Sequence, residues 1–260
     1  MASPVDGPPR VEYRPPSSWL DDLKVLRAMW FASVPKGAKH AEWLEGFYAS
    51  QAELYDGYRF RMLHARTPMM LRAPAPKGGV WVDLGGGTGS NMEYFGGGLS
   101  HFSRVVLVDL TPSLAAVARA RVERNGWGGF VDVVCGDATD EALPGLPPAG
   151  TADLVTISYA VTMIPNWRDV VANAKRLLRP GGHLCVADFT VDTTPTGWGL
   201  LNAFWKYVFA HDHVMLSEEH VPYLQSQFET VELGRGYGTF PYVPPLIRAP
   251  WYYFVGMKRL

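Results

Sequence analysis

The sequence has little cysteine, little net charge and no long apolar run. Only Cys135 and Cys185 occur among its 260 residues, which excludes a disulfide framework and a four-cysteine zinc site. Its 24 basic and 25 acidic residues leave a formal charge of -1, so the strong basic excess of a general nucleic-acid binder is missing. No stretch approaches the run of about 18 apolar residues that a spanning helix needs. We therefore expect a cytoplasmic protein that binds no nucleic acid, with peripheral membrane contact left open.

Proline and glycine divide the chain into three parts. Five prolines within residues 1–16 predict a flexible arm, and the segment lacks the apolar core of a signal peptide. Residues 17–75 predict a helical extension, made of one helix around Leu20–Trp30 and a second stretch from about 40 to 71 that breaks near 55–58. The remainder, 76–260, predicts one domain with a helical insertion at about 196–227.

Strand-like and helical segments alternate through this third part. Short apolar runs predict strands at 80–84, 104–109, 130–135, 152–158, 183–189, 230–233 and 251–258. Helical spacing occupies 90–94, 113–125 and 167–178 between them. The pattern predicts an α/β fold with a mostly parallel seven-stranded sheet, helices on both faces and an added antiparallel C-terminal pair.

The sharpest local signal is a glycine-rich loop directly after the first strand. Its spacing is Gly85-x-Gly87-x-Gly89, and Ser90 stands where the third glycine of the dinucleotide fingerprint would fall. Asp83 precedes the loop, where a negative charge disfavours a pyrophosphate and favours a ligand with an ammonium group. A purely structural turn is the alternative interpretation.

Polar residues follow the next strands at the same relative position. Asp109 ends the second strand about twenty residues after the loop, where an acid typically binds a ribose diol. Asp137 follows the third strand and Ser158 ends the fourth. Each acid alone is equally consistent with a helix cap or a surface carboxylate. Together they predict a ligand site at the carboxyl ends of the strands.

This ordered set, from Val80 to Phe189, resembles the class I S-adenosylmethionine-dependent methyltransferases, whose fold is Rossmann-like. The resemblance implies S-adenosylmethionine as cofactor and requires no metal. It implies that Asp83 and the loop face the methionine moiety, that Asp109 binds the ribose, and that Asp137 with Ala138 binds adenine. The full set of cofactor residues that we expect is Tyr55, Arg59, Asp83, Gly85, Gly86, Gly87, Thr88, Gly89, Asp109, Leu110, Asp137, Ala138 and Ser158.

The flanks, at 40–66, 210–220 and 241–253, resemble the N-methyltransferase part of betaine-lipid synthases. That resemblance implies successive methylation of the amine of diacylglyceryl-homoserine to the trimethylated betaine lipid. It further implies a lipid substrate met at a membrane surface, which is the endoplasmic reticulum if the source is eukaryotic. A partner that transfers the aminocarboxypropyl group, either fused or separate, is also implied.

The candidate catalytic residues are Tyr159, His211, Asp212 and His213. The last three are candidates for taking a proton from the amine, and Arg59 or Arg66 for binding a substrate carboxylate. Aromatic faces attract a quaternary ammonium, which makes Tyr55, Tyr159, Trp205 and Tyr207 candidate cage residues. Core packing of the aromatic residues and solvated pairing of the arginines are the alternatives. A single His-x-His without a third ligand nearby predicts no metal site.

Three other functions remain open at this point. The enzyme could methylate another amine, such as a phospholipid head group or a small metabolite. A nucleotide-dependent oxidoreductase is disfavoured by the glycine spacing and by Asp83. A non-catalytic binding subunit is disfavoured by the complete set of polar residues at the strand ends.

Overall fold

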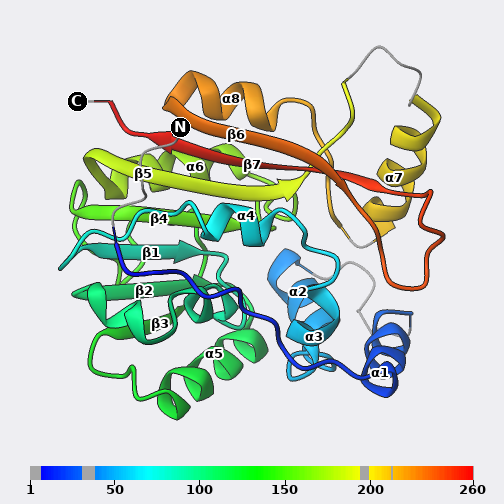
Figure 1. Ribbon diagram of the computed structural model, residues 1–260, viewed down its shortest axis with the longest axis horizontal. Coiled ribbons are helices and arrows are strands. Elements are labelled where there is room, and N and C mark those ends of the chain that lie inside the picture. The colour runs from blue at the N-terminus through cyan, green and yellow to red at the C-terminus, as the bar shows by residue number, and fades with distance from the viewer. Residues whose placement is uncertain (1–6, 31–38, 194–198, 212, 260) are drawn as a thin grey trace.

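The computed structural model describes residues 7–30, 39–193, 199–211 and 213–259. Its centre is a seven-stranded sheet in the order β3-β2-β1-β4-β5-β7-β6 (Figure 1). Strands β1 to β5 pair in parallel, and β7 pairs antiparallel with both β5 and β6. The strands are β1 (Val80–Leu84), β2 (Arg104–Asp109), β3 (Val131–Cys135), β4 (Ala152–Ser158), β5 (Leu178–Phe189), β6 (Glu229–Gly238) and β7 (Ala249–Met257). The predicted fold class is confirmed.

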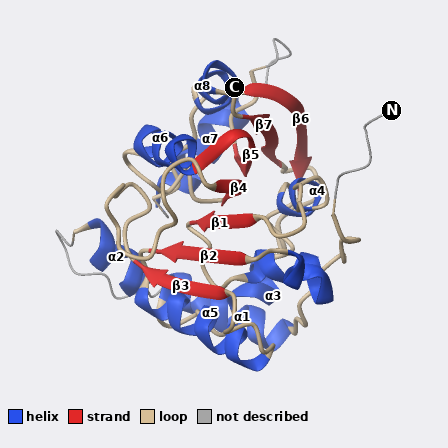
Figure 2. Ribbon diagram, turned by 90° about the vertical axis from the view of Figure 1, so that its left-hand side faces the viewer, coloured by secondary structure: helices blue, strands red, loops and turns tan. Residues whose placement is uncertain are grey.

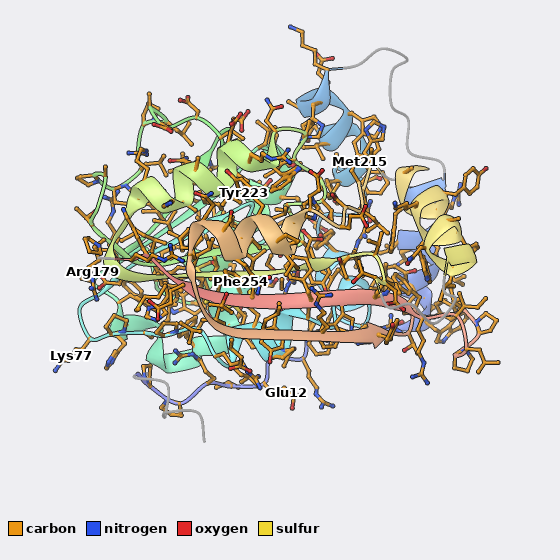
Figure 3. All side chains as sticks on the ribbon, turned by 90° about the horizontal axis from the view of Figure 1, so that it is seen from above. Glu12, Lys77, Arg179, Met215, Tyr223 and Phe254 are labelled. Atoms are coloured by element: carbon orange, nitrogen blue, oxygen red, sulfur yellow. The ribbon has the colours of Figure 1, made fainter. Side chains whose placement is uncertain are left out.

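Helices cover both faces of this sheet (Figure 2). One face packs on α4, on the 3₁₀ helix η1 and on α5, whereas α6 and α8 cover the other. Figure 3 shows α8 lying over β6 and β7, with Phe254 in the strand beneath. The helices are α1 (Trp19–Trp30), α2 (His40–Tyr48), α3 (Tyr55–Arg59), α4 (Arg66–Met70), η1 (Ser90–His101), α5 (Pro112–Arg124), α6 (Trp167–Leu177), α7 (Gly199–His211) and α8 (His220–Gln227).

The two cores follow from the side-chain alternation of the strands. In β1, Trp81 enters the core beneath α4 and η1, whereas Val82 and Leu84 enter the core beneath α6 and α8. The same alternation separates Leu107 from Val108 in β2. Because both faces are buried, these strands read in the sequence as continuous apolar runs.

The helical extension differs from the expectation in its detail. The stretch from about 40 to 71 forms three short helices, α2, α3 and α4, rather than two longer ones. The insertion at about 196–227 likewise forms α7 and α8, with a non-helical segment between them. Figure 1 shows α2 and α3 beyond the carboxyl end of β1, which is where they can close over a ligand site.

The described residues 7–16 of the predicted flexible arm make several contacts with the fold. The Val11 N–H donates to the Tyr94 carbonyl at 2.7 Å. The Arg10 guanidinium lies over the Phe95 ring and donates to the Ala73 carbonyl. Proline prevents regular pairing but not these individual contacts, which the sequence does not reveal.

Within the described residues, no helix combines the length and apolar character needed to cross a membrane.

Candidate active site

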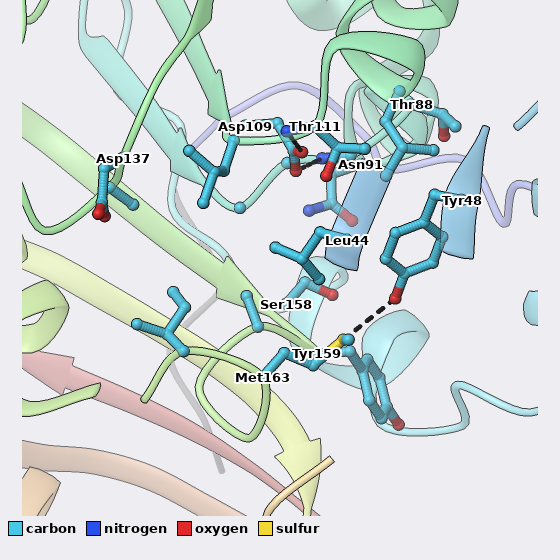
Figure 4. A pocket seen from close by; sticks show the side chains of 18 of the residues that line it. Leu44, Tyr48, Thr88, Asn91, Asp109, Thr111, Asp137, Ser158, Tyr159 and Met163 are labelled. Atoms are coloured by element: carbon cyan, nitrogen blue, oxygen red, sulfur yellow. Dashed lines mark hydrogen bonds between the residues drawn. The ribbon is translucent and has the colours of Figure 1, made fainter. Parts of the chain in front are cut away.

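A pocket of about 250 Å³ lies at the carboxyl ends of β1, β2, β3 and β4 (Figure 4). The glycine loop and the strand ends form one wall, and α2 with α3 forms the other. Asp137 lies at one end of the pocket, Asp109 near its middle, and Tyr48 and Tyr159 toward the other end. Twelve sequence-predicted residues line it: Tyr55, Arg66, Gly85, Gly86, Gly87, Thr88, Asp109, Leu110, Asp137, Ala138, Ser158 and Tyr159.

The glycine loop requires its glycines for conformation and for space. Gly85, Gly87 and Gly89 have positive φ angles of 69°, 58° and 75°. A Cβ on Gly85 would lie only 2.6 Å from the Cβ of Ala160, on the loop that follows β4. Gly87 borders the pocket, and a Cβ there would meet nothing within 4 Å. Gly89 does not line the pocket, and its positive φ shapes the turn.

The carboxylate of Asp109 joins the end of β2 to the glycine loop. It accepts the Gly87 N–H at 2.8 Å and the Thr111 N–H at 2.9 Å. Burial raises the pKa of this carboxyl, and the two N–H donors oppose that effect. Because a carboxylate offers about four acceptor positions, capacity remains for hydroxyl donors from the pocket.

Asp83 lies behind the pocket rather than in its wall. Its side chain is fully buried and accepts the Thr156 hydroxyl at 2.5 Å and the Asn91 Nδ2 at 3.1 Å. Burial raises the pKa of Asp83 to about 6. The sequence places this acid next to the loop but does not show that it acts through a neighbour.

That neighbour, Asn91, does line the pocket. Both Asp83 oxygens accept from its Nδ2, which orients the amide and directs its carbonyl oxygen away from Asp83. Among the described residues, none hydrogen-bonds this buried Oδ1. A buried acceptor without a partner is costly, so the site suits a cationic N–H donor from a ligand.

Arg66 supplies a cation at the same end of the pocket. Its Nε donates to the Ser158 hydroxyl at 3.1 Å and its Nη1 to the Ser90 hydroxyl at 3.0 Å. Arg66 was a sequence candidate for a carboxylate, and it lines the pocket. Arg59 does not, because its guanidinium packs against the rings of Phe47 and Tyr55. Its expected contact with the cofactor stays a prediction.

Aromatic side chains of the N-terminal helices form the opposite wall. Tyr48 and Tyr55 meet edge to face, with their ring centroids 5.5 Å apart. The Tyr48 hydroxyl reaches the Met163 sulfur at 3.1 Å (Figure 4). Several residues of the pocket do not follow from the sequence, because helical spacing alone does not show which face of α2 is turned inward. They include His40, Leu44, Tyr48, Ser90, Asn91, Thr111, Met163, Ile164 and Asn166.

Tyr159 lines the pocket, but its hydroxyl is already engaged. It accepts the backbone N–H of Ala65 at 2.9 Å, and Figure 4 shows it turned away from Asp109. Burial raises the pKa of this phenol far above its usual value. The side chain therefore stays protonated and is unsuited to take a proton.

Of the other catalytic candidates, only His213 has a described side chain, and it does not line the pocket. His213 is exposed and stacks on Trp43 of α2, with ring centroids 3.9 Å apart. His211 ends α7 with a side chain outside the described part, and Asp212 lies outside the described residues altogether.

Two of the four cage candidates lie away from the pocket. Trp205 packs inside an aromatic cluster with Phe209 and Phe240, and Tyr207 is 82% exposed on α7. Neither lines the pocket, whereas Tyr55 and Tyr159 do.

Comparison with known proteins identifies the family. A family model described as a methyltransferase domain matches residues 82–186. Ubiquinone/menaquinone biosynthesis C-methyltransferase UbiE from Hydrogenovibrio crunogenus is 34% identical over 171 residues, which cover 64% of this chain and 65% of that relative. UbiE from Enterobacter sp. is 33% identical over 176 residues, covering 66% and 68%. The chain thus spans about two thirds of the length of these relatives.

Solved structures share the fold at lower identity. A putative methyltransferase from Bacillus halodurans superposes with a TM-score of 0.61 at 21% identity, covering 76% of this chain and all of that one. Phosphoethanolamine N-methyltransferase 2 from Haemonchus contortus superposes with a TM-score of 0.63 at 16% identity, covering 87% and 61%.

The glycine loop, the acids at the strand ends, the sheet order and these relatives all agree, and together they decide against a nicotinamide oxidoreductase. The chain belongs to the class I S-adenosylmethionine-dependent methyltransferases, and S-adenosylmethionine is its methyl donor.

Proposed function

We propose that this enzyme methylates the amine of diacylglyceryl-homoserine in successive steps, giving the trimethylated betaine lipid. One observation carries the proposal. The segment 40–66, one of the three on which the resemblance to betaine-lipid synthases depends, contributes the pocket wall opposite the glycine loop. The substrate itself must come from a reaction that transfers an aminocarboxypropyl group to diacylglycerol, and a fused or separate partner would supply it.

The pocket residues divide by chemistry along its length. We assign the adenine to Asp137 and Ala138 and the ribose diol to Asp109, with Leu110 packing nearby. The Asn91 Oδ1 would accept from the ammonium of the amino-acid tail, and Arg66 would bind its carboxylate. Asp83 contributes by orienting Asn91. S-adenosylmethionine, when bound, supplies the methyl group on a sulfonium, so these residues serve to align it and to exclude water.

The aromatic wall suits an amine that becomes more methylated with each cycle. Tyr48 and Tyr55 present rings to the pocket beside the Met163 thioether. A quaternary ammonium cannot donate a hydrogen bond, whereas an aromatic face attracts it by about 0.5–2 kcal/mol. These two tyrosines replace Trp205 and Tyr207 as the cage that we propose.

The surface beside the pocket supports a substrate that resides in a membrane. Apolar side chains are exposed on three elements: α1, α7 and the loop between β6 and β7. They are Trp19, Leu20, Leu23, Phe204, Tyr207, Tyr242 and Leu246, which we call the apolar end. Figures 1 and 3 place α1 and α7 at the same end of the molecule. Tryptophan and tyrosine favour the membrane–water interface, and exposed Lys206 and Arg248 lie on the same elements.

Hydrogen bonds hold these three elements together. The Tyr242 hydroxyl donates to Asp22 of α1 at 2.5 Å, and the Trp205 indole N–H donates to the Arg248 carbonyl at 2.8 Å. The apolar end is therefore a surface of fixed shape rather than a set of independent side chains. We propose that it contacts the bilayer while the head group enters the pocket.

A direct assay tests the substrate. The full chain is incubated with S-adenosylmethionine and with vesicles that contain one of three acceptors. The acceptors are diacylglyceryl-homoserine, phosphatidylethanolamine and a demethylated quinone. Mass spectrometry should show three added methyls on the homoserine lipid. Methyl transfer to a quinone carbon, the reaction named for the UbiE relatives, would overturn the proposal, and so would transfer only to phosphatidylethanolamine. The Asp109→Ala variant serves as the low-activity control.

A further inference from the structure

The short helix α3 contacts the glycine loop through a buried carboxylate. Tyr55 and Asp56 are adjacent in α3, and Tyr55 lines the pocket. Asp56 instead accepts the hydroxyl of Thr88 at 2.6 Å, and Thr88 belongs to the glycine loop and to the pocket wall. The Asp56 side chain is 13% exposed and also forms an ion pair with Arg121 of α5.

Arg121 completes the contact from the other side. Its Nη1 donates to the Thr88 carbonyl at 2.7 Å, and its Nε lies 3.2 Å from a Glu93 carboxylate oxygen. The side chain is 6% exposed. Thr88 is therefore held at its hydroxyl by an anion from α3 and at its carbonyl by a cation from α5. Removing Arg121 would leave Asp56 buried without a cation, whereas removing Asp56 would leave Arg121 with Glu93 as its remaining anion.

We propose that Asp56 is a positioning residue that couples the N-terminal helices to the cofactor loop. When α3 lies over the pocket, its carboxylate fixes Thr88 and with it the cofactor side of the pocket. By linkage, a cofactor that favours this loop conformation stabilises α3 in the same place to the same extent. The coupling concerns cofactor binding alone and does not depend on which substrate accepts the methyl group.

A second carboxylate in the same extension provides a matched control. Asp22 of α1 is buried, forms an ion pair with Arg61 and accepts the Tyr242 hydroxyl. It thus shares with Asp56 a buried site, an arginine partner and a hydroxyl donor. It does not contact the glycine loop, since its bonds run to Arg61 and to the loop between β6 and β7.

The experiment compares Asp56→Asn with Asp22→Asn in the full chain. Titration calorimetry measures the Kd for S-adenosylhomocysteine, and steady-state kinetics separate KM for S-adenosylmethionine from kcat. We expect Asp56→Asn to raise the Kd by about 5- to 150-fold, with KM rising in parallel and kcat at saturation little changed. Asp22→Asn should change the Kd by less than about twofold, although both variants lose stability. Equal effects on affinity, or none from Asp56→Asn, would overturn the coupling.

Hydrogen exchange measures whether the ligand protects α3, an effect that a general loss of stability in the variant would not abolish selectively. S-adenosylhomocysteine should slow amide exchange over residues 55–59 in the wild type and in Asp22→Asn, but much less in Asp56→Asn. Should Asp56→Asn fail to fold, Thr88→Val removes only the hydroxyl and should raise the Kd in the same direction. Ligand-independent exchange at 55–59 in the wild type would refute the proposal even if the enzyme methylates the expected lipid.

Discussion

At the scale of single residues, Asp109 has the clearest expected effect on cofactor binding. Its carboxylate organises Gly87 and Thr111 and faces the pocket. If the ribose lies where we propose, replacing Asp109 by alanine removes charged hydrogen bonds to its diol, so we expect Asp109→Ala to weaken binding of S-adenosylhomocysteine by about 1–3 kcal/mol. The control is Asp132→Ala on β3, which removes a surface ion pair with Arg104 of β2 and should leave binding unchanged. Calorimetric titration measures the affinity of both variants for S-adenosylhomocysteine. Equal affinities of the two variants would show that the ribose lies elsewhere.

The buried carboxyl of Asp83 gives a prediction about pH. Burial raises its pKa from 3.8 to about 6 in the folded protein. Ionisation is therefore less favourable in the folded than in the unfolded state, and Asp83 lowers stability increasingly as pH rises from 3.8 through about 6. Asp83→Asn lacks this contribution. We expect its free energy of unfolding to rise relative to that of the wild type between about pH 5 and about pH 7.5.

Urea unfolding at both pH values measures this difference. The same variant should also bind S-adenosylhomocysteine more weakly at either pH, because an amide at position 83 no longer offers two acceptors to Nδ2 of Asn91. A stability difference that stays constant with pH would contradict the raised pKa. Unchanged affinity would mean that Asn91 needs no orientation by Asp83.

At the scale of the element, two glycines with nearly the same φ angle allow the cost of steric overlap to be distinguished from the cost of backbone strain. Gly85 and Gly126 have φ angles of 69° and 68°. A Cβ at Gly126 meets nothing within 4 Å, whereas one at Gly85 lies 2.6 Å from the Cβ of Ala160. We expect Gly126→Ala to cost about 1 kcal/mol from backbone strain alone. Gly85→Ala should cost at least about 1 kcal/mol more, and it should also abolish cofactor binding.

Chemical denaturation and calorimetry on both variants test this expectation. Equal losses of stability would show that the contact with Ala160 relaxes freely. Retained affinity in Gly85→Ala would show that the turn tolerates a side chain while bound to the cofactor.

The strands of the sheet could be predicted because their burial on both faces requires apolar residues at consecutive positions. Continuous apolar runs such as Val105–Val108 mark strands covered on both faces, and Gly85, Gly87 and Gly89 mark a turn that other residues enter only with strain. The side-chain alternation of β1 also indicates where the Asp83 carboxylate lies. Alternation puts Asp83 on the same face as Trp81, directed toward Thr156 rather than toward the strand end.

Helix α1 could be predicted from its apolar spacing, but the division of the following stretch into α2, α3 and α4 could not. Helices of five residues, such as α3 and α4, are too short to show a periodic pattern, and their ends depend on tertiary contacts. Asp56 and Arg66 lie in these helices, so their partners Thr88 and Ser158 follow only from the fold. The pairing of the described arm residues with η1 is equally non-local.

At the scale of the whole molecule, the sheet topology places the pocket and the apolar end on the same side. The parallel strands β1 to β4 all present their carboxyl ends there, and α1 contacts α3, which closes the pocket. A head group could thus enter the pocket while acyl chains stay in the bilayer. This arrangement predicts that membrane contact and cofactor binding are separable functions of one end of the protein.

Substitution of two well-exposed residues tests that separation. Trp19 is 66% and Leu246 is 87% exposed, so the double variant Trp19→Ser, Leu246→Ser should leave the fold intact. Burial of such a side chain contributes about 1.5–3 kcal/mol, and we expect vesicle partitioning to fall at least roughly tenfold. KM for a vesicle-borne substrate should rise, while the Kd for S-adenosylhomocysteine stays unchanged. Val231→Ser, at a 55% exposed site on β6, is the control for a lost apolar side chain and should sediment with vesicles like the wild type. Equal partitioning of all three proteins would show that the apolar end does not meet the bilayer, and the substrate would then have to reach the pocket from solution.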